Sequence, residues 1–322
     1  MLYFRFCNSQ MRLLLSLTLV AGLTTHLPLY GQQRAIVAGN DTLVVGTYAY
    51  GTVDRVGAVT PLAAHLSVRL GRPTRVVAAP DPVALARFVR DGQVDVAVTN
   101  TFGYLLLADG PNPAALPVAT FHVPPGVSTN YGTVIVSGVP NVRTMADLSR
   151  RASSLAITLV APGSTTGNLV PRLFMATQGL ADLEGQFRTV SYAGTHAETF
   201  ASLRARRSDV AALATEEFER QHSADTTGAA TRVAVLWRSP DIQLGPLAVR
   251  AQLPAALRDS IAKAVVGLER SAAPAFAALR GGWTEAMKSD ALVTANDQTY
   301  DAVRRLFGSG ATAAALIAKF AR

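Results

Sequence analysis

Short apolar runs alternate with helical patterns along most of this 322-residue chain. The helical pattern of residues 55–70 places Val59, Leu62 and Leu66 on one side and ends at Gly71. The runs that predict strands are 42–47, 75–79, 94–99, 116–123, 131–137, 155–160, 187–192, 209–214, 233–237 and 244–251. Strands separated by helices of ordinary length form βαβ units, so the alternation predicts an α/β fold with parallel sheets.

The same alternation predicts two lobes. The run at 131–137 is long enough to leave a first sheet, and a new series of strands and helices begins after it. We expect a discontinuous first lobe of residues 36–135 and 240–322, and a second lobe of residues 136–239. Two lobes joined by two crossings form a hinged clamp with a cleft. The helical patterns that close the chain are 254–270, 273–279 and 296–307.

Residues 1–35 are typical of an export signal. Arg12 supplies the positive charge, and the apolar run from Leu13 to Leu23 is shorter than the roughly 20 residues that span a membrane. Met11 is the better start codon, and Cys7 precedes the apolar run, where it cannot be a lipid-bearing cysteine. We therefore predict a periplasmic protein, with an uncleaved membrane anchor as the alternative.

The net charge of +8 does not indicate nucleic-acid binding. The basic residues are almost all arginines scattered along the chain, and they form no stripe with interleaved aromatic residues. The histidines have no spacing typical of metal ligands. Composition and spacing thus predict no nucleic-acid partner, no metal and no cofactor.

One stretch combines a strand, a tight turn and the start of a helix. After the run 155–160, Pro162-Gly163 turns the chain, and Ser164, Thr165, Thr166 and Gly167 open a helix that ends at Gly179. Serine and threonine cap helices, but three hydroxyls in a row exceed what one cap needs. The free N–H groups and partial positive charge of a helix start bind anions. The stretch predicts an anion site, with an ordinary capped helix as the alternative.

Polar residues follow other predicted strands in the first lobe. Tyr48 and Tyr50 come after the first strand, and Thr99, Asn100 and Thr101 come after the third. Ligands in open α/β sheets bind beyond the carboxyl ends of the strands. These residues are candidates for ligand contact, with a role as polar loop residues equally open.

Several stretches together resemble one family, the phosphonate-, phosphite- and phosphate-binding proteins of ABC importers. They are Ala78–Asp81, Gly92–Ala97, Pro162–Pro171, and Ala193–His196 followed by Ser208–Ala211. The similarity covers about Leu43 to Leu279 and implies the type II periplasmic-binding fold, with a hinged cleft between two α/β lobes. It implies a monomer that delivers a small oxyanion to an ABC permease in the inner membrane.

The resemblance also implies roles for individual residues. Ser164, Thr165 and Thr166 are expected to hold the phosphorus oxyanion, and His196 is expected to donate another hydrogen bond to it. Hydrogen bonds to a charged acceptor are about twice as strong as neutral ones. Tyr131 matches a tyrosine near the hinge, where packing between lobes is the alternative role.

This chain departs from the aminoethylphosphonate binders of that family. Pro82 and Thr99 stand where those proteins have aromatic residues. Of the two acidic residues that clasp the ligand amine, one matches Glu216 and the other falls at Gly245. A single carboxylate is a poorer ammonium site, so phosphite, phosphate, methylphosphonate or another oxyanion is at least as well matched.

Other functions are compatible with some of these features. The same fold could serve as a sensor input or bind a sulfonate, because fold does not settle function. A hydrolase would use Ser164 as nucleophile and His196 as base. However, Gly163 directly precedes Ser164, which departs from the Gly-x-Ser-x-Gly elbow. We therefore expect a binding protein and not an enzyme.

Overall fold

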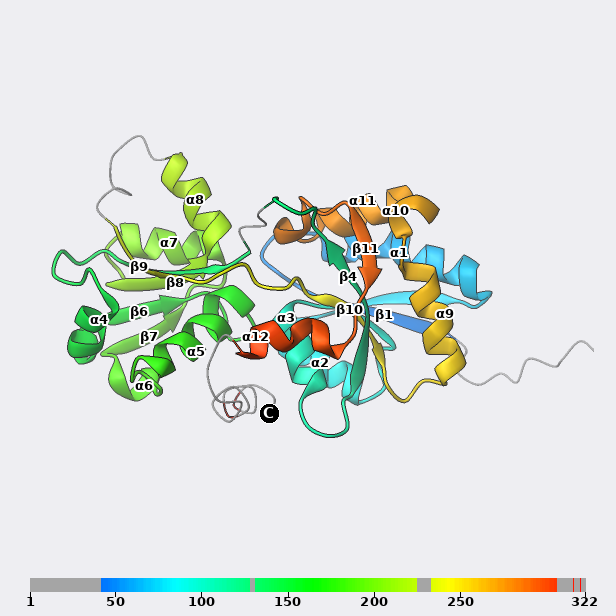
Figure 1. Cartoon of the computed structure of the whole chain (residues 1–322), viewed down its shortest axis with the longest axis horizontal. Helices are drawn as coiled ribbons and strands as arrows, with labels where there is room; N and C mark the ends of the chain where they lie inside the picture. The colour runs from blue at the N-terminus through cyan, green and yellow to red at the C-terminus, as the bar shows by residue number, and fades with distance from the viewer. Residues whose placement is uncertain (1–41, 128–130, 225–232, 306–314, 316–318, 320–322) are drawn as a thin grey trace, which may run out of the picture. The chain divides into compact units, whose positions relative to one another are not determined.

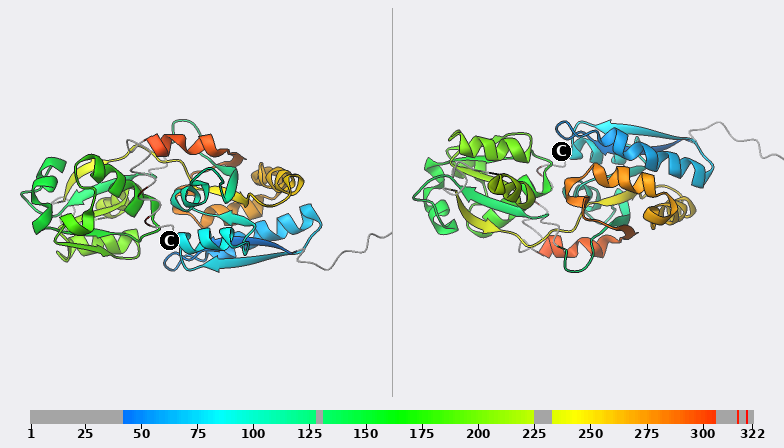
Figure 2. Two further views of the ribbon diagram at one scale, coloured as in Figure 1. Left: turned by 90° about the horizontal axis from the view of Figure 1, so that it is seen from below. Right: turned by 90° about the horizontal axis from the view of Figure 1, so that it is seen from above.

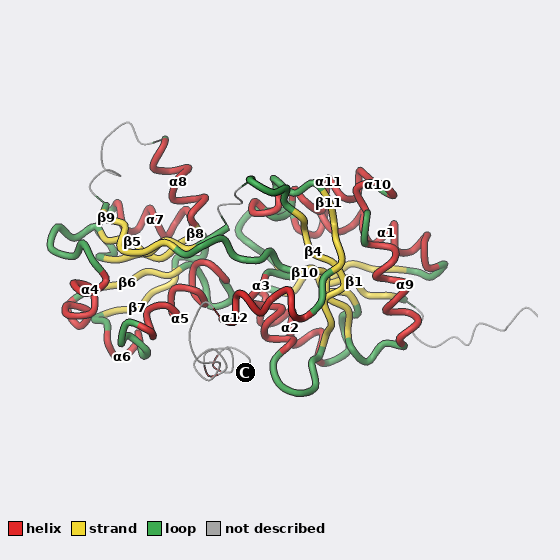
Figure 3. Tube along the Cα trace, in the orientation of Figure 1, coloured by secondary structure: helices red, strands yellow, loops and turns green. Residues whose placement is uncertain are grey.

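The computed structural model describes residues 42–127, 131–224 and 233–305, together with positions 315 and 319. The predicted export signal and Cys7 lie outside these residues. Within them, no helix combines the length and the apolar character that a membrane crossing needs. The described residues form two mixed sheets flanked by helices, which confirms the predicted α/β class (Figures 1 and 3).

The first sheet has six strands in the order β11-β4-β10-β3-β1-β2. Strand β1 pairs in parallel with β2 and β3, whereas β10 pairs antiparallel with β3 and β4. The strands are β1 Leu43–Tyr48, β2 Thr74–Ala79, β3 Val96–Val98, β4 Ala115–His122, β10 Pro246–Arg250 and β11 Ala291–Thr294. The helices of this lobe are α1 Arg55–Leu70, α2 Pro82–Arg90, α3 Thr101–Ala108, α9 Ala255–Val265, α10 Leu268–Ser271, α11 Ala273–Gly281 and α12 Asp301–Arg305. In both views of Figure 2, α1 and α12 lie on opposite sides of this lobe.

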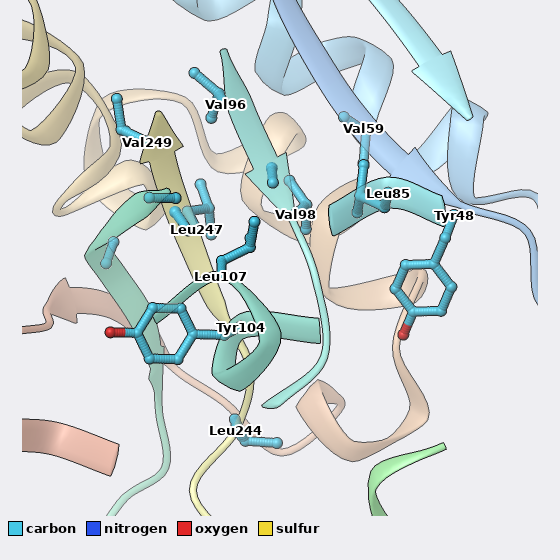
Figure 4. Packing of buried hydrophobic residues seen from close by; sticks show 14 of the residues in the cluster. Tyr48, Val59, Leu85, Val96, Val98, Tyr104, Leu107, Leu244, Leu247 and Val249 are labelled. Atoms are coloured by element: carbon cyan, nitrogen blue, oxygen red, sulfur yellow. The ribbon is translucent and has the colours of Figure 1, made fainter. Parts of the chain in front are cut away.

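A single apolar core holds the first lobe together. Every residue of β1 is buried, as expected for a strand covered by helices on both faces. Figure 4 shows Val96 and Val98 of β3 beside Leu247 and Val249 of β10, with Leu107 of α3 packed over them. This packing fixes the carboxyl ends of β1 and β3, from which the candidate site residues extend.

The second sheet has five strands in the order β7-β6-β8-β5-β9. Strand β6 pairs in parallel with β7 and β8, and β5 pairs antiparallel with β8 and β9. The strands are β5 Thr133–Ser137, β6 Ala156–Leu159, β7 Thr189–Tyr192, β8 Val210–Ala214 and β9 Ala234–Arg238. The helices are α4 Met145–Arg151, α5 Val170–Thr177, α6 Leu183–Gln186, α7 His196–Arg204 and α8 Thr215–Ser223.

Alternate residues of this sheet enter two different apolar clusters. Ile135 of β5 packs with residues of α4, α5 and α6, whereas Val134 and Val136 pack with Phe200 of α7 and Phe218 of α8. This is the period of two that a strand with both faces buried requires. Helices therefore cover both faces of the sheet, and its strand ends remain available for a site.

The chain passes twice between the sheets, once between β4 and β5 and once between β9 and β10. The two passages are hydrogen-bonded to each other, because the N–H of Ile242 donates to the carbonyl of Tyr131 over 2.8 Å. The first residue of β5 is Thr133, slightly before the predicted change of lobe at 135/136. The division into residues 36–135 with 240–322 and 136–239 stays a prediction.

The structure differs from the sequence prediction in several elements. Strand β11 and helix α3 were not expected, because β11 is short and α3 is apolar on all sides and lacks a 3.6-residue period. The predicted helix 254–270 ends at Val265, and a new helix starts after Gly267, which has a φ of 75°. Helix 296–307 begins instead as a 3₁₀ turn, Asp297–Tyr300, before α12.

Candidate functional site

A cavity of about 860 Å³ opens where the carboxyl ends of several strands meet. Of the predicted ligand residues, all except Thr99, Thr101 and Gly167 line it. The segments lining it include 48–53 after β1, 80–84 after β2, 161–166 after β6, 194–197 after β7 and 214–217 at the end of β8. This is the position that open α/β sheets give to ligands.

Ser164 caps the helix that opens at this cavity. Its Oγ accepts a hydrogen bond from the N–H of Gly167 over 3.0 Å, and the first turn, Thr165–Leu169, is a π-turn that continues into α5. The N–H groups of Thr165 and Thr166 are the first two of the helix and have no acceptor within it. Because the cap uses a lone pair of Ser164, its hydroxyl hydrogen remains available to an anion.

Thr165 and Asn100 connect this helix start to the first lobe. The Oγ1 of Thr165 accepts from the N–H of Phe102 over 3.0 Å and also hydrogen-bonds with the side chain of Tyr131. The Nδ2 of Asn100 donates to the carbonyl of Gly163 over 2.9 Å. The hydroxyl of Thr165 is thus used within the protein, and its backbone N–H is the group left for a ligand.

His196 is the first residue of α7 and is held in one tautomer. Its Nδ1 lies 3.0 Å from the N–H of Ala214, which can only donate, so Nδ1 accepts and carries no proton. Burial lowers the pKa of His196 to about 4, the nearby Glu217 charge opposing this only in part. The neutral ring therefore carries its proton on Nε2, as a hydrogen-bond donor.

Four carboxyl side chains line the cavity, although the sequence predicted only that of Glu216; they belong to Asp81, Glu216, Glu217 and Glu285. Glu216 lies in the first turn of α8, and Glu285 lies in the 3₁₀ turn Thr284–Ala286. Burial raises the pKa of both groups, and the charge of Glu285 further raises that of Glu216. The carboxyl groups of Glu216 and Glu285 are thus easier to protonate than free ones.

Arg55 supplies a buried positive charge to the cavity wall. It starts α1, is only 6% exposed, and its Nε donates to the carbonyl of Gly282 over 3.1 Å. Its Cζ lies over the rings of Tyr48, Tyr50 and Trp283 at 4.2, 4.9 and 4.7 Å. This cation was not predicted, because an arginine in the first turn of a helix usually faces solvent.

Three glycine and threonine positions contribute to packing. A Cβ at Gly167 would overlap the side chain of Val160, so this glycine lets the helix start approach β6. Thr99 is buried at the end of β3, outside the cavity lining. A Cβ at Gly245 would overlap the backbone of Thr99 and Asn100, which leaves no room there for an acidic side chain.

The arrangement can bind a small oxyanion through directional donors. Free N–H groups at a helix start, the Ser164 hydroxyl and the His196 Nε2–H suit an acceptor with several oxygens. Among the described residues, no group of three or more His, Cys, Asp or Glu side chains is placed to hold a metal ion.

Several solved structures have a similar fold. An ABC phosphonate transporter binding protein from Pseudomonas aeruginosa is 19% identical, with a TM-score of 0.61 over 82% of this chain and 85% of its own. A Prochlorococcus marinus protein in complex with methylphosphonate is 14% identical, with a TM-score of 0.61 over 83% and 97%. The aliphatic sulphonate binding protein of Escherichia coli is 15% identical, with a TM-score of 0.50 over 87% and 88%.

These neighbours establish the two-lobed type II periplasmic-binding fold that the sequence predicted. A search of curated protein sequences finds no match to the chain. A family profile, in contrast, matches residues 48–300, which include every strand after β1 and every predicted ligand residue. The chain belongs to the family of periplasmic substrate-binding proteins of phosphonate ABC transporters.

Proposed function

We propose that this protein captures a small phosphorus oxyanion, namely phosphite, phosphate or a phosphonate, and delivers it to an ABC permease. One observation supports this most directly. The capped helix start at Ser164 and the His196 ring line the same cavity, although they follow different strands. In the proposed complex, the Ser164 hydroxyl, the N–H groups of Thr165 and Thr166, and His196 Nε2–H each donate to a ligand oxygen.

The second lobe supplies most of these donors, and the first lobe would close over the ligand. Asn100 and Tyr131, which line the cavity from the first lobe and the passage between lobes, would complete the enclosure. Fixed dipoles in a site that excludes water bind an anion without a counter-ion in direct contact. Such a receptor works as a monomer in the periplasm, with residues 1–35 as its export signal.

We propose that the protein is not a hydrolase, because the tautomer of His196 is wrong for a general base. A base facing Ser164 through Nε2 would need that nitrogen unprotonated. The N–H of Ala214 instead holds the lone pair of Nδ1, which leaves the proton on Nε2. An activated ester should therefore not be turned over faster by the wild-type chain than by Ser164→Ala.

Calorimetric titration of the folded protein tests the proposal. The ligands are phosphite, phosphate, methylphosphonate and methanesulfonate. The last of these tests the alternative that the protein binds sulfonates. We expect heat with at least one phosphorus oxyanion, and weaker binding in Ser164→Ala. Heat with methanesulfonate alone would reassign the protein to sulfonates, and absence of heat with all four ligands would refute the proposal.

A further inference from the structure

Arg55 has a hydrogen-bonding nitrogen without a partner. The residue is 6% exposed, and among the described residues its Nη1 finds no acceptor. A buried donor left without a partner destabilises the folded state, and a charged one does so more strongly. A ligand oxygen that accepts from Nη1 would remove this cost. The free protein therefore already holds an unpaired buried donor for such an oxygen.

Aromatic contacts hold the guanidinium in place. The rings of Tyr48, Tyr50 and Trp283 pack against it, and its Nε is fixed by the carbonyl of Gly282. Aromatic stacking engages the faces of a guanidinium and not its N–H groups. Nε is used by Gly282 and the group also donates to the Tyr48 hydroxyl, so Nη1 is the nitrogen available to a ligand. A carboxylate oxygen would accept from Nη1 in a charge-assisted hydrogen bond, which is stronger than a bond to a neutral acceptor.

The guanidinium lies near the proposed oxyanion site but is separate from it. Tyr50 connects the two, because its ring lies 4.9 Å from Arg55 Cζ and 6.3 Å from the His196 ring, and its hydroxyl accepts from the His196 backbone N–H. The cavity of about 860 Å³ is in the range of pockets that hold drug-sized ligands, whereas methylphosphonate is a very small molecule. A ligand held at Ser164 thus has room for a substituent that extends to Arg55.

We propose that Arg55 forms a second subsite for a carboxylate on the organic substituent of the ligand, so that the preferred ligand is a carboxyalkylphosphonate. This inference rests on the proposed function, since Ser164 and His196 hold the phosphorus group. The competing internal partner is Glu285, which lines the same cavity and interacts electrostatically with Arg55. If Glu285 forms an ion pair with Arg55 when the cleft closes, Arg55 contributes equally to the binding of every ligand and gives no preference for a carboxylate.

Calorimetry of the full chain with phosphonoacetate, phosphonopropionate, methylphosphonate and aminoethylphosphonate tests this. We expect a carboxyalkylphosphonate to bind at least about tenfold more tightly than methylphosphonate, the size of one hydrogen bond to a charged group. Arg55→Gln should abolish this preference, because it should weaken binding of the carboxyalkylphosphonate by at least about tenfold more than binding of methylphosphonate. The matched control is Arg69→Gln, which removes an exposed arginine of the same helix outside the cavity and should change neither Kd.

The order of affinities for these ligands is measured on the wild-type chain and requires no variant. If Arg55→Gln does not fold, Arg55→Lys takes its place in the experiment. Lysine keeps the charge but lacks the fork, so part of the preference should remain. Equal binding of all phosphonates, tighter binding of aminoethylphosphonate, or equal losses for all ligands in Arg55→Gln would overturn the carboxylate subsite. In those cases heat with methylphosphonate still supports the proposed function, whereas no heat with any ligand refutes both.

Discussion

Two substitutions of His196 should separate its contribution to stability from its contribution to binding. The ring uses Nδ1 as an acceptor for Ala214 and leaves Nε2–H for the ligand. In His196→Asn, the amide oxygen can replace Nδ1, but no group reaches the position of Nε2. In His196→Gln, the longer side chain brings an amide N–H to the position of Nε2 and leaves the N–H of Ala214 without an acceptor.

The magnitudes follow from these two hydrogen bonds. A hydrogen bond to a charged group contributes about 1.5–3 kcal/mol, so His196→Asn should weaken binding of methylphosphonate by about 10- to 150-fold. Ala214 is buried, and leaving its N–H unpaired should cost His196→Gln about 1–3 kcal/mol of unfolding free energy. For a chain of this size, each kcal/mol lowers the melting temperature by roughly 2–4 °C.

Calorimetric titration and thermal unfolding, on the same preparations, measure the two effects. We expect His196→Asn to lose affinity with little change in melting temperature, and His196→Gln to melt earlier while it retains more of the affinity. If His196→Asn binds methylphosphonate as tightly as the wild-type chain, Nε2 does not contact the ligand. If both variants melt like the wild-type chain, the bond to Ala214 is not formed in solution.

Three further predictions concern stability, pH and the helix start. Ser164→Ala removes a cap and should lower the unfolding free energy by about 1 kcal/mol in urea titration, besides weakening methylphosphonate binding. Thr165→Val leaves the N–H of Phe102 unpaired and should cost about 1–3 kcal/mol in the same assay, whereas Thr165→Ser should be close to the wild-type chain. Because the pKa of His196 is lowered from 6.5 to about 4, the unfolded chain binds more protons in this interval, and stability should fall as the pH drops through it. Unfolding at pH 7 and pH 5 measures this slope, which should be shallower in His196→Asn; an equal slope would assign the effect to other groups.

Local signals in the sequence predicted the helix start well. The turn before Ser164 and the hydroxyl run after it depend on neighbours within a few residues, and the cap from Ser164 to Gly167 has this local origin. Most strands were found for the same reason, since a buried strand between helices has its own apolar run. Helix α3 was not predicted. Because it is buried on every side, its apolar residues do not recur with the 3.6-residue period that indicates a helix.

Long-range contacts explain what the sequence could not show. Arg55 is buried because Gly282 and Trp283, more than two hundred positions later in the chain, pack against it. No local sequence pattern predicts a contact over that separation. Glu285 reaches the cavity from a short turn in the last third of the chain. The hydrogen bond from the N–H of Phe102 to the Thr165 hydroxyl also joins segments that are far apart in the sequence. The sequence alone therefore predicted the capped helix start at Ser164 and the carboxyl group of Glu216, but not the charges of Arg55 and Glu285 in the cavity lining.

The contact between Pro82 and Gly163 bears on where a substituent of the ligand can go. A Cβ at Gly163 would lie 2.8 Å from Cδ of Pro82, so the start of α2 touches the turn that precedes Ser164. Pro82 occupies the position where the resemblance implies an aromatic residue in aminoethylphosphonate binders, and it offers no flat ring to a ligand. The aromatic side chains that line the cavity are instead those of Tyr131 and of Tyr48 and Tyr50, the last two of which pack on Arg55. A phosphonate held at Ser164 would therefore place its substituent against the Arg55 wall, where charge rather than stacking decides which ligand is preferred.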